Sequence, residues 1–260
     1  MTPKARKSPP PAPTKAAGEL TYSTYLSLDE LLQLQRPRSR PEHPDELLFI
    51  IVHQSSELWF KLILHELATL IGLLEAKDTL GALTSVRRVN ALVHIVTGQL
   101  SALETLPPQR FAQFREYLGT SSGSQSVQFR AIEAMSGMRD EQFLRVLKQH
   151  GEIPDLVKEA FEKATLQQLF DDLLIAHNVT VEQIYSEVHQ RPLQMLAEGL
   201  LEYEQGFAMW RFLHVQLVER IIGPATSGTG GTLGSRYLQM TVSQRFFPHL
   251  WEVRSKFFQR

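Results

Sequence analysis

Cysteine is absent from this chain of 260 residues. Without thiols the protein cannot form disulfides, thiolate zinc sites or iron–sulfur clusters, and it cannot bind haem through a thiolate. The absence does not fix a cellular compartment, but no feature of the sequence points to secretion. We therefore expect a cytoplasmic protein.

A strong charge of either sign is also missing, because the formal net charge is −1. No basic excess favours nucleic-acid binding, and no acidic tail favours a basic partner. Long apolar runs are missing too: the best candidate, Leu47 to Val52, is followed at once by His53 and Gln54. Since a membrane helix needs about 20 predominantly apolar residues, we expect no membrane span.

The segment from Met1 to Gly18 is rich in proline, alanine and lysine and has no apolar signal-peptide core. This composition predicts a disordered tail. A transit peptide is a weak alternative, because the segment holds only one arginine. Residues 19–260 are expected to form a single domain.

Beyond the tail, apolar residues recur at three- and four-residue steps, which is typical of amphipathic helices. Asp45 and Glu46 precede the first long run, where acidic residues favour a helix N-terminus. Gly223 and Pro224 end another run, because proline cannot continue a helix. The predicted helices cover residues 47–74, 80–103, 127–135, 181–188, 193–222 and 237–258, with short helices between 140 and 174. Few runs have the two-residue period of strands, so the sequence predicts an all-α protein.

Two of the nine histidines, His53 and His214, each lie inside an apolar, helix-like run. A buried imidazole needs a partner, and the commonest one is a backbone carbonyl; for His53, Glu57 is a further candidate. Alternatively, both histidines face one polar object inside a helical core, such as a haem with a substrate above it. No His-Glu-x-x-His or Glu-x-x-His occurs, which argues against zincin and di-iron sites, whereas haem needs only one protein ligand.

Three further features have both a binding and a structural interpretation. Arg115 could pair with a substrate carboxylate or be a solvated surface arginine. The segment Gly228–Gly231 is no nucleotide-binding loop, but it could be a linker or a lid that brings Thr229 to a ligand. Tyr22 and Tyr25 share one helical face, which indicates core packing or an oligomer contact.

Seven ordered blocks of residues run through the chain between Leu20 and Lys256 and together resemble the tryptophan 2,3-dioxygenase family. The blocks are Thr21-Tyr-x-x-Tyr-Leu26, Leu48-Phe-Ile-Ile-x-His-Gln-x-x-Glu-Leu-Trp59, Leu103-Glu-Thr-Leu106, Phe114-Arg115, Ser121-Ser-Gly-x-Gln-Ser126, Trp210-Arg-x-x-His-x-x-x-Val-x-Arg220 and Gly228-Thr-Gly-Gly231. Chance agreement over so many ordered blocks is negligible.

The resemblance implies an all-α helical bundle that buries haem b. It makes His214 the proximal ligand to the haem iron, with Ser122 and Gly123 also at the cofactor. Dioxygen would be the co-substrate.

For the substrate, the resemblance puts His53 on the distal side, as the catalytic residue that hydrogen-bonds the indole N–H. Arg115 would pair with the substrate carboxylate, helped by Thr229 near the ammonium group. Phe49 and Phe111 would pack on the indole ring.

The resemblance also implies a homotetramer. In the family, the N-terminal segment crosses into the active site of a neighbouring subunit. Tyr22, Tyr25 and Leu26 would therefore be substrate-binding residues contributed by another chain.

The implied activity is cleavage of the indole C2–C3 bond of L-tryptophan by dioxygen, giving N-formyl-L-kynurenine in tryptophan catabolism. The sequence departs from the family pattern near the substrate: Ser124 stands where many members have phenylalanine, and Thr232-Leu233 replaces two serines. Two alternatives therefore stay open. One is a related haem monooxygenase acting on a substituted tryptophan or indole in secondary metabolism, and the other is a non-catalytic haem or indole sensor.

Overall fold

The structure, a computed structural model, describes residues 20–139, 153–224, 226 and 235–259. Within these ranges helices form and strands do not, which confirms the predicted all-α class. The chain divides into two compact units, one ending at Arg36 and the other beginning at Pro37. The predicted disordered tail lies outside the described residues, and the single domain over residues 19–260 stays a prediction.

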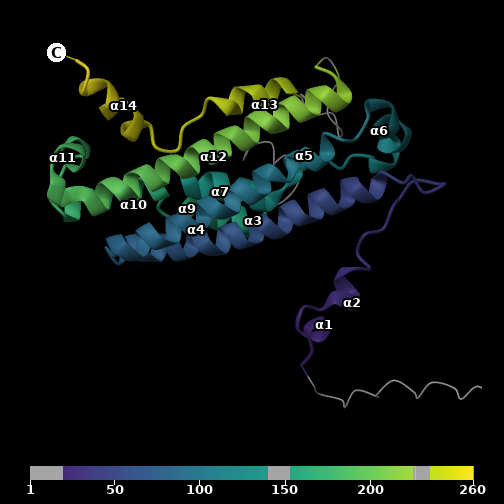
Figure 1. The fold of residues 1–260 in the computed structure, drawn as a ribbon, viewed down its shortest axis with the longest axis horizontal. Helices are drawn as coiled ribbons and strands as arrows, with labels where there is room; N and C mark the ends of the chain where they lie inside the picture. The colour runs from purple at the N-terminus through teal and green to yellow at the C-terminus, as the bar shows by residue number, and fades with distance from the viewer. Residues whose placement is uncertain (1–19, 140–152, 225, 227–234, 260) are drawn as a thin grey trace, which may run out of the picture. The chain divides into compact units, whose positions relative to one another are not determined.

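The first unit carries two four-residue helices and the second unit carries all the others (Figure 1). The described α-helices are α1 (Tyr22–Tyr25), α2 (Leu28–Leu31), α3 (Glu46–Glu75), α4 (Thr79–Gly98), α5 (Leu100–Leu103), α6 (Pro108–Phe114), α7 (Val127–Ser136), α9 (Asp155–Glu162), α10 (Leu166–Ala176), α11 (Val181–Ser186), α12 (Arg191–Ile222), α13 (Ser235–Val242) and α14 (Pro248–Lys256). The short 3₁₀ helices are η1 (Arg115–Leu118), η2 (Gly123–Gln125) and η3 (Val188–Gln190).

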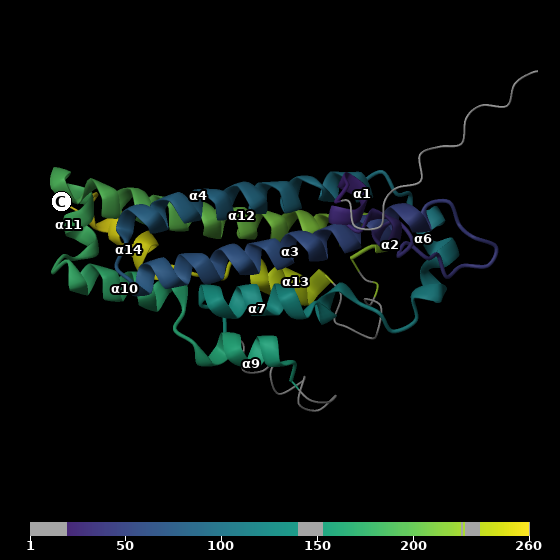
Figure 2. The same ribbon diagram turned by 90° about the horizontal axis from the view of Figure 1, so that it is seen from below.

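In the second unit, α4 runs lengthwise beside α3 and also beside α12 (Figures 1 and 2). Helices α7 and α10 pack against α3, and α13 packs along α12. Helix α6 lies at one end of this assembly and α11 at the opposite end, as both views show. The chain therefore returns along α12 toward the end where α3 begins.

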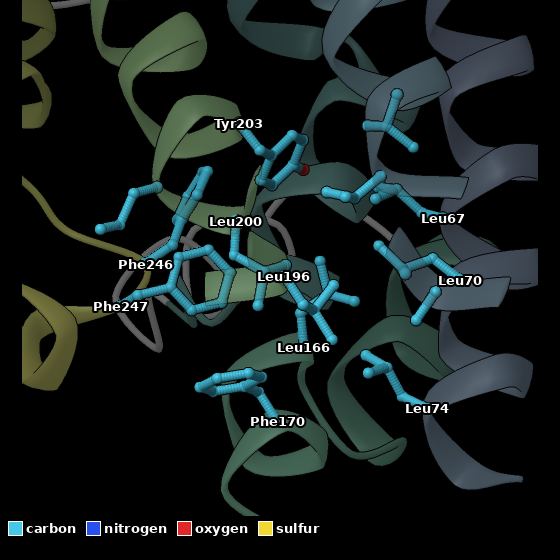
Figure 3. Packing of buried hydrophobic residues seen from close by; sticks show 14 of the residues in the cluster. Leu67, Leu70, Leu74, Leu166, Phe170, Leu196, Leu200, Tyr203, Phe246 and Phe247 are labelled. Carbon is cyan, nitrogen blue, oxygen red and sulfur yellow. The ribbon is translucent and has the colours of Figure 1, made fainter. Parts of the chain in front are cut away.

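The end of this unit nearest α11 has a densely packed apolar core (Figure 3). Leu67 and Leu70 of α3 and Leu196 of α12 have no solvent-exposed surface. Each fully buried side chain of this size contributes roughly 1.5–3 kcal/mol relative to its exposed state. The other labelled members are Leu74, Leu166, Phe170, Leu200, Tyr203, Phe246 and Phe247.

The helix predicted over residues 80–103 is interrupted, and that part of the prediction is wrong. Helix α4 ends at Gly98, and α5 starts again at Leu100. Between them, the side-chain amide of Gln99 donates to the hydroxyl of Ser56 at 2.7 Å, while its oxygen accepts from Ser55 at 2.9 Å. Through these two hydrogen bonds, Gln99 connects the junction of α4 and α5 to α3.

The helix predicted over residues 237–258 is also two helices, because α13 ends at Val242 and α14 starts at Pro248. Proline suits the first turn of a helix but not its interior. The buried carboxylate of Glu204 accepts the backbone N–H groups of Phe246 and Phe247, at 2.6 and 2.7 Å. These bonds satisfy two donors that a continuous helix would have used internally.

By length and composition α3 could span a membrane, contrary to the expectation that no segment could. The core helix of a soluble protein passes the same test. Ile63, Leu67 and Leu70 of α3 are fully buried against other helices of this chain. The length and composition of α3 are therefore only weak evidence that it spans a membrane.

Candidate active site

A pocket of about 270 Å³ opens between α3, α5, α6, α7 and α12. Its volume is close to the lower limit of about 300 Å³ that is common for ligand sites. It lies in the part of the second unit where α3 begins and α12 ends. Seven of the residues singled out in the sequence line it: Phe49, His53, Phe111, Arg115, Ser122, Gly123 and His214.

His53 projects from α3 into the pocket, and one of its ring nitrogens is paired. Nδ1 lies 2.7 Å from the carbonyl oxygen of Phe49. A carbonyl can only accept, so in this geometry Nδ1 carries the proton and Nε2 of the neutral ring has a free lone pair. Burial lowers the pKa of His53, against smaller opposing effects of this bond and of Glu57, which keeps the ring neutral.

The partner of His53 is thus the backbone, the commonest of the expected partners, and not Glu57. The carboxylate of Glu57 instead accepts from the side-chain amide of Gln128 at 2.8 Å, and the same amide donates to the Glu57 backbone carbonyl at 2.9 Å. These bonds join α7 to α3 beside the pocket. Glu57 influences His53 only through its charge.

His214 differs from His53, because its ring nitrogens have no hydrogen-bond partner among the described residues. Its ring stacks on Trp210, one turn earlier in α12, with centroids 5.0 Å apart and planes inclined by 23°. Burial, with a smaller contribution from His53, lowers the pKa of His214 to about 4. The ring is therefore neutral near pH 7, the form in which imidazole binds a metal ion.

Aromatic rings form one wall of the pocket. The ring of Phe49 lies 4.1 Å from that of His53 and 5.6 Å from that of Phe111, measured between centroids. Phe111 comes from α6, whose first turn begins with Pro108. A two-point ion pair between Arg110 and Asp45 ties α6 to the start of α3. This contact holds α6, which carries Phe111, close to the start of α3, which carries Phe49.

The polar side of the pocket follows directly after α6. Arg115 is half-buried at the start of η1. Gly119 has a φ of 57°, a conformation that favours glycine, and it reverses the chain toward Ser122 and Gly123. Ser126 then caps α7 by accepting from the backbone N–H of Phe129 at 3.2 Å. The loop is thus held between two helices at the pocket edge.

For four further residues predicted for the site, the placement at this pocket stays a prediction. Thr229 lies outside the described residues. Tyr22, Tyr25 and Leu26 belong to the first unit, and their side chains are 76%, 72% and 40% exposed. Helix α1 forms there because the side chains and backbone N–H groups of Thr21 and Thr24 cap each other.

The pocket also contains residues that the sequence did not single out as site residues. Ser56 and Phe60 follow His53 at three and seven positions on α3, and Trp210 precedes His214 by four on α12. The helical period could have found these. Arg130, one turn after Ser126, had no such signal, because nothing in the sequence tells a pocket-facing arginine from an exposed one.

The residues present fit a haem. A neutral, unpaired imidazole in a largely apolar pocket has the chemistry of an axial ligand to haem iron. The indole N–H of Trp210 is likewise buried without a partner in the described part of the chain. Among the residues that the structure describes, no group of three or more histidine, aspartate or glutamate side chains could hold a bare metal ion.

Comparison with known proteins gives the family. The family model described as tryptophan 2,3-dioxygenase matches residues 11–176 and 172–257. A tryptophan 2,3-dioxygenase of Caulobacter vibrioides is 39% identical over 92% of this chain and 99% of its own length. One of Herpetosiphon aurantiacus is 40% identical, with 91% and 98% covered, and one of Anaeromyxobacter dehalogenans is 38% identical, with 93% and 98% covered. The chain belongs to the tryptophan 2,3-dioxygenase family.

Proposed function

We propose that this protein is a haem-dependent tryptophan 2,3-dioxygenase that converts L-tryptophan and dioxygen into N-formyl-L-kynurenine. The observation that carries the proposal is the meeting of two neutral histidines, His53 and His214, in one aromatic pocket of a chain of this family. Both oxygen atoms enter the product as the indole C2–C3 bond breaks. The monooxygenase and sensor alternatives are not favoured, since the relatives compared are named dioxygenases.

In this proposal His214 holds haem b through the iron, and Ser122 and Gly123 contact the cofactor. When bound, the haem supplies the redox chemistry that dioxygen requires. The chain's own contribution is to keep His214 neutral by burial and to fix its ring against Trp210. Apolar helix faces around the pocket exclude water from the reacting groups.

The substrate is held by other residues of the same pocket. His53 accepts the indole N–H at Nε2, because Nδ1 already donates to the Phe49 carbonyl. Arg115 pairs with the α-carboxylate, and Thr229 assists near the ammonium group. Phe49 and Phe111 pack on the indole ring. Together these contacts orient C2 and C3 for reaction, which is where much of the rate enhancement arises.

We further propose that the protein acts as a cytoplasmic homotetramer in which the first unit completes the site of a neighbouring subunit. Its support is the exposure of Tyr22 and Tyr25 in a single chain, since exposed aromatic clusters often mark interfaces. Mixed oligomers of Tyr25→Ala and His53→Ala subunits should regain some activity, because some sites then draw both intact halves from different chains. A fully active monomer would contradict this arrangement.

The decisive experiment measures the product. Ferrous protein is mixed anaerobically with L-tryptophan and then exposed to oxygen labelled with ¹⁸O, and the product mass is recorded. Incorporation of two labelled atoms into N-formylkynurenine is the expected result. A product with one labelled atom indicates the monooxygenase, and the absence of turnover with intact haem and tryptophan binding indicates the sensor.

A further inference from the structure

Gln99, at the junction of α4 and α5, forms hydrogen bonds through both ends of its side-chain amide. The nitrogen donates to the hydroxyl of Ser56 at 2.7 Å, and the oxygen accepts from the hydroxyl of Ser55 at 2.9 Å. The hydroxyl of Ser56 in turn donates to the carbonyl of Val52 at 2.8 Å. Since Val52 directly precedes His53, this chain of hydrogen bonds reaches from the start of α5 to the helical turn that carries His53.

Helix α5, which begins directly after Gln99, forms part of the pocket wall. Its two leucines, Leu100 and Leu103, line the pocket, and they are only 5% and 4% exposed. They pack in one apolar cluster with Val52 of α3 and Leu217 of α12. Each of these partners lies within one turn of the pocket histidine on its own helix. Helix α5 therefore contacts both histidine-bearing helices at the pocket.

The distance between the two histidines matters, because each ring has a nitrogen able to bind iron. His53 keeps the lone pair of Nε2 free, since Nδ1 is bonded to the carbonyl of Phe49. The ring nitrogens of His214 have no hydrogen-bond partner among the described residues. Neutral imidazole is a common metal ligand, and a haem iron that binds two imidazoles has no position left for dioxygen. A haem dioxygenase with two such rings in one pocket therefore has to keep one of them away from the iron.

We propose that Gln99 keeps His53 from becoming a second ligand to the haem iron, by fixing α5 against the helices of both histidines. A helix of four residues is far too short to be stable alone, so its position depends on its tethers. Gln99 does not line the pocket and is therefore a positioning residue. The inference rests on the proposed function, because it takes His214 as the iron ligand.

The test compares absorption and resonance Raman spectra of the ferrous holoprotein for the wild type, Gln99→Met and Gln99→Met/His53→Ala. Methionine is similar in length to glutamine but can form neither hydrogen bond. Asn90→Leu is the matched control. The amide of Asn90 also joins α4 to another helix, because it donates to the carbonyl of Gly199 at 3.0 Å, but neither residue lines this pocket.

The wild type and Asn90→Leu should contain five-coordinate, high-spin iron with one histidine ligand. In Gln99→Met the spectrum should shift toward six-coordinate, low-spin iron with two histidine ligands. The added His53→Ala substitution should reverse this shift. A Gln99→Met spectrum identical to that of Asn90→Leu would overturn the proposal. So would a low-spin form that persists in the double variant, because a group other than His53 would then be the ligand.

Should Gln99→Met fail to fold or to keep haem, Ser55→Ala carries the test, because it removes one of the two hydrogen bonds and does not line the pocket. Carbon monoxide binds only to iron with a free axial position. Flash photolysis of its complex therefore detects even a small share of His53-bound iron, as a slow phase of rebinding. A slow phase in Ser55→Ala that is absent from the wild type and from Ser55→Ala/His53→Ala supports the proposal, and single-phase rebinding in Ser55→Ala overturns it.

These readouts depend on the state of the iron and not on product. Wild-type protein that binds haem and tryptophan without forming N-formylkynurenine would contradict the proposed function alone. Five-coordinate iron in every variant of an active dioxygenase would contradict the role of Gln99 alone.

Discussion

Helices α3 and α12 each change character partway along their length. Toward α11, their inward faces carry apolar side chains that are completely buried, such as Leu67 and Leu196. Toward α6, the same faces carry His53, Ser56 and His214 around a pocket. The helical period continues through both halves, so the backbone geometry is shared. Only the chemistry of the inward residues changes.

The part of α3 and α12 toward α11, the solid half, and the part toward α6, the pocket half, therefore have different roles. In the solid half, burial of apolar surface supplies free energy of folding. In the pocket half, the ring of His53 bonds a backbone carbonyl, whereas the ring nitrogens of His214 have no hydrogen-bond partner among the described residues. An unpaired buried nitrogen lowers stability unless a ligand engages it. The pocket half is thus the part of the molecule that gains most from binding.

The largest effect that separates the two halves is expected for His214→Ala. Loss of the axial ligand should abolish the Soret band of histidine-ligated haem and with it the activity. Added imidazole should restore part of the spectrum, since the substitution leaves space beside Trp210. His177→Ala, at the exposed end of α10, is the control and should keep both. A wild-type ferrous spectrum in His214→Ala would disprove the assignment.

Arg115→Ala should have the next largest effect. Loss of a desolvated carboxylate partner costs about 2–5 kcal/mol, which lowers kcat/KM for L-tryptophan by roughly 30-fold to several thousand-fold. Arg115→Lys should recover little of this, because lysine cannot form the two-point contact. Steady-state kinetics check the prediction, and an unchanged kcat/KM would exclude Arg115 from substrate binding.

In the solid half, Leu67→Ala should destabilise the protein without changing its chemistry. Leu67 is fully buried, so truncation leaves a cavity and lowers the free energy of unfolding by about 3 kcal/mol. Denaturant unfolding measures this effect. The haem spectrum and the KM for L-tryptophan should stay at wild-type values. Ile175→Ala, at a position 75% exposed, should shift the unfolding free energy by less than about 0.5 kcal/mol. If both substitutions lowered the free energy of unfolding by the same amount, Leu67 would not be a core residue that stabilises the fold.

The sequence predicts the solid half well, because helical periodicity depends on local spacing. It recovers α3, α7 and α12 nearly to their ends. It misses the breaks at Gln99 and before Pro248, since the bonds that stabilise them come from Ser55, Ser56 and Glu204, far away in the chain. Proline at position 248 was a local signal for the second break.

For the pocket half, the sequence identifies the two histidines as unusual, and the resemblance gives them roles. It does not identify Arg130 as a pocket residue: its pair with Glu133 is local to α7, but the contact of Glu133 with Arg211 exists only once α7 packs near α12. Nor does it choose the partner of His53. Phe49 and Glu57 are both one turn away, and only the side-chain geometry favours the Phe49 carbonyl.

The smallest expected effect concerns the pH dependence of substrate binding at His53. Protonation of Nε2 would remove the lone pair that accepts the indole N–H. Because burial holds the pKa of His53 below its usual value, the KM for L-tryptophan should stay flat as pH falls through about 6.5 and rise only below that. The charge of Glu57 raises this pKa and the neutral His214 ring adds no charge.

Glu57→Gln should therefore move the rise in KM to lower pH, because removing the negative charge makes protonated His53 less stable. At the most acidic pH that the protein tolerates, the KM of Glu57→Gln should therefore be several-fold lower than that of the wild type. At pH 7 the two KM values should be nearly equal, because His53 is neutral in both proteins. His53→Gln is the control, since glutamine can accept the indole N–H but does not titrate; its KM should show no acid rise. A rise that moves to higher pH in Glu57→Gln, or that persists unchanged in His53→Gln, would mean that another group governs the acid limb.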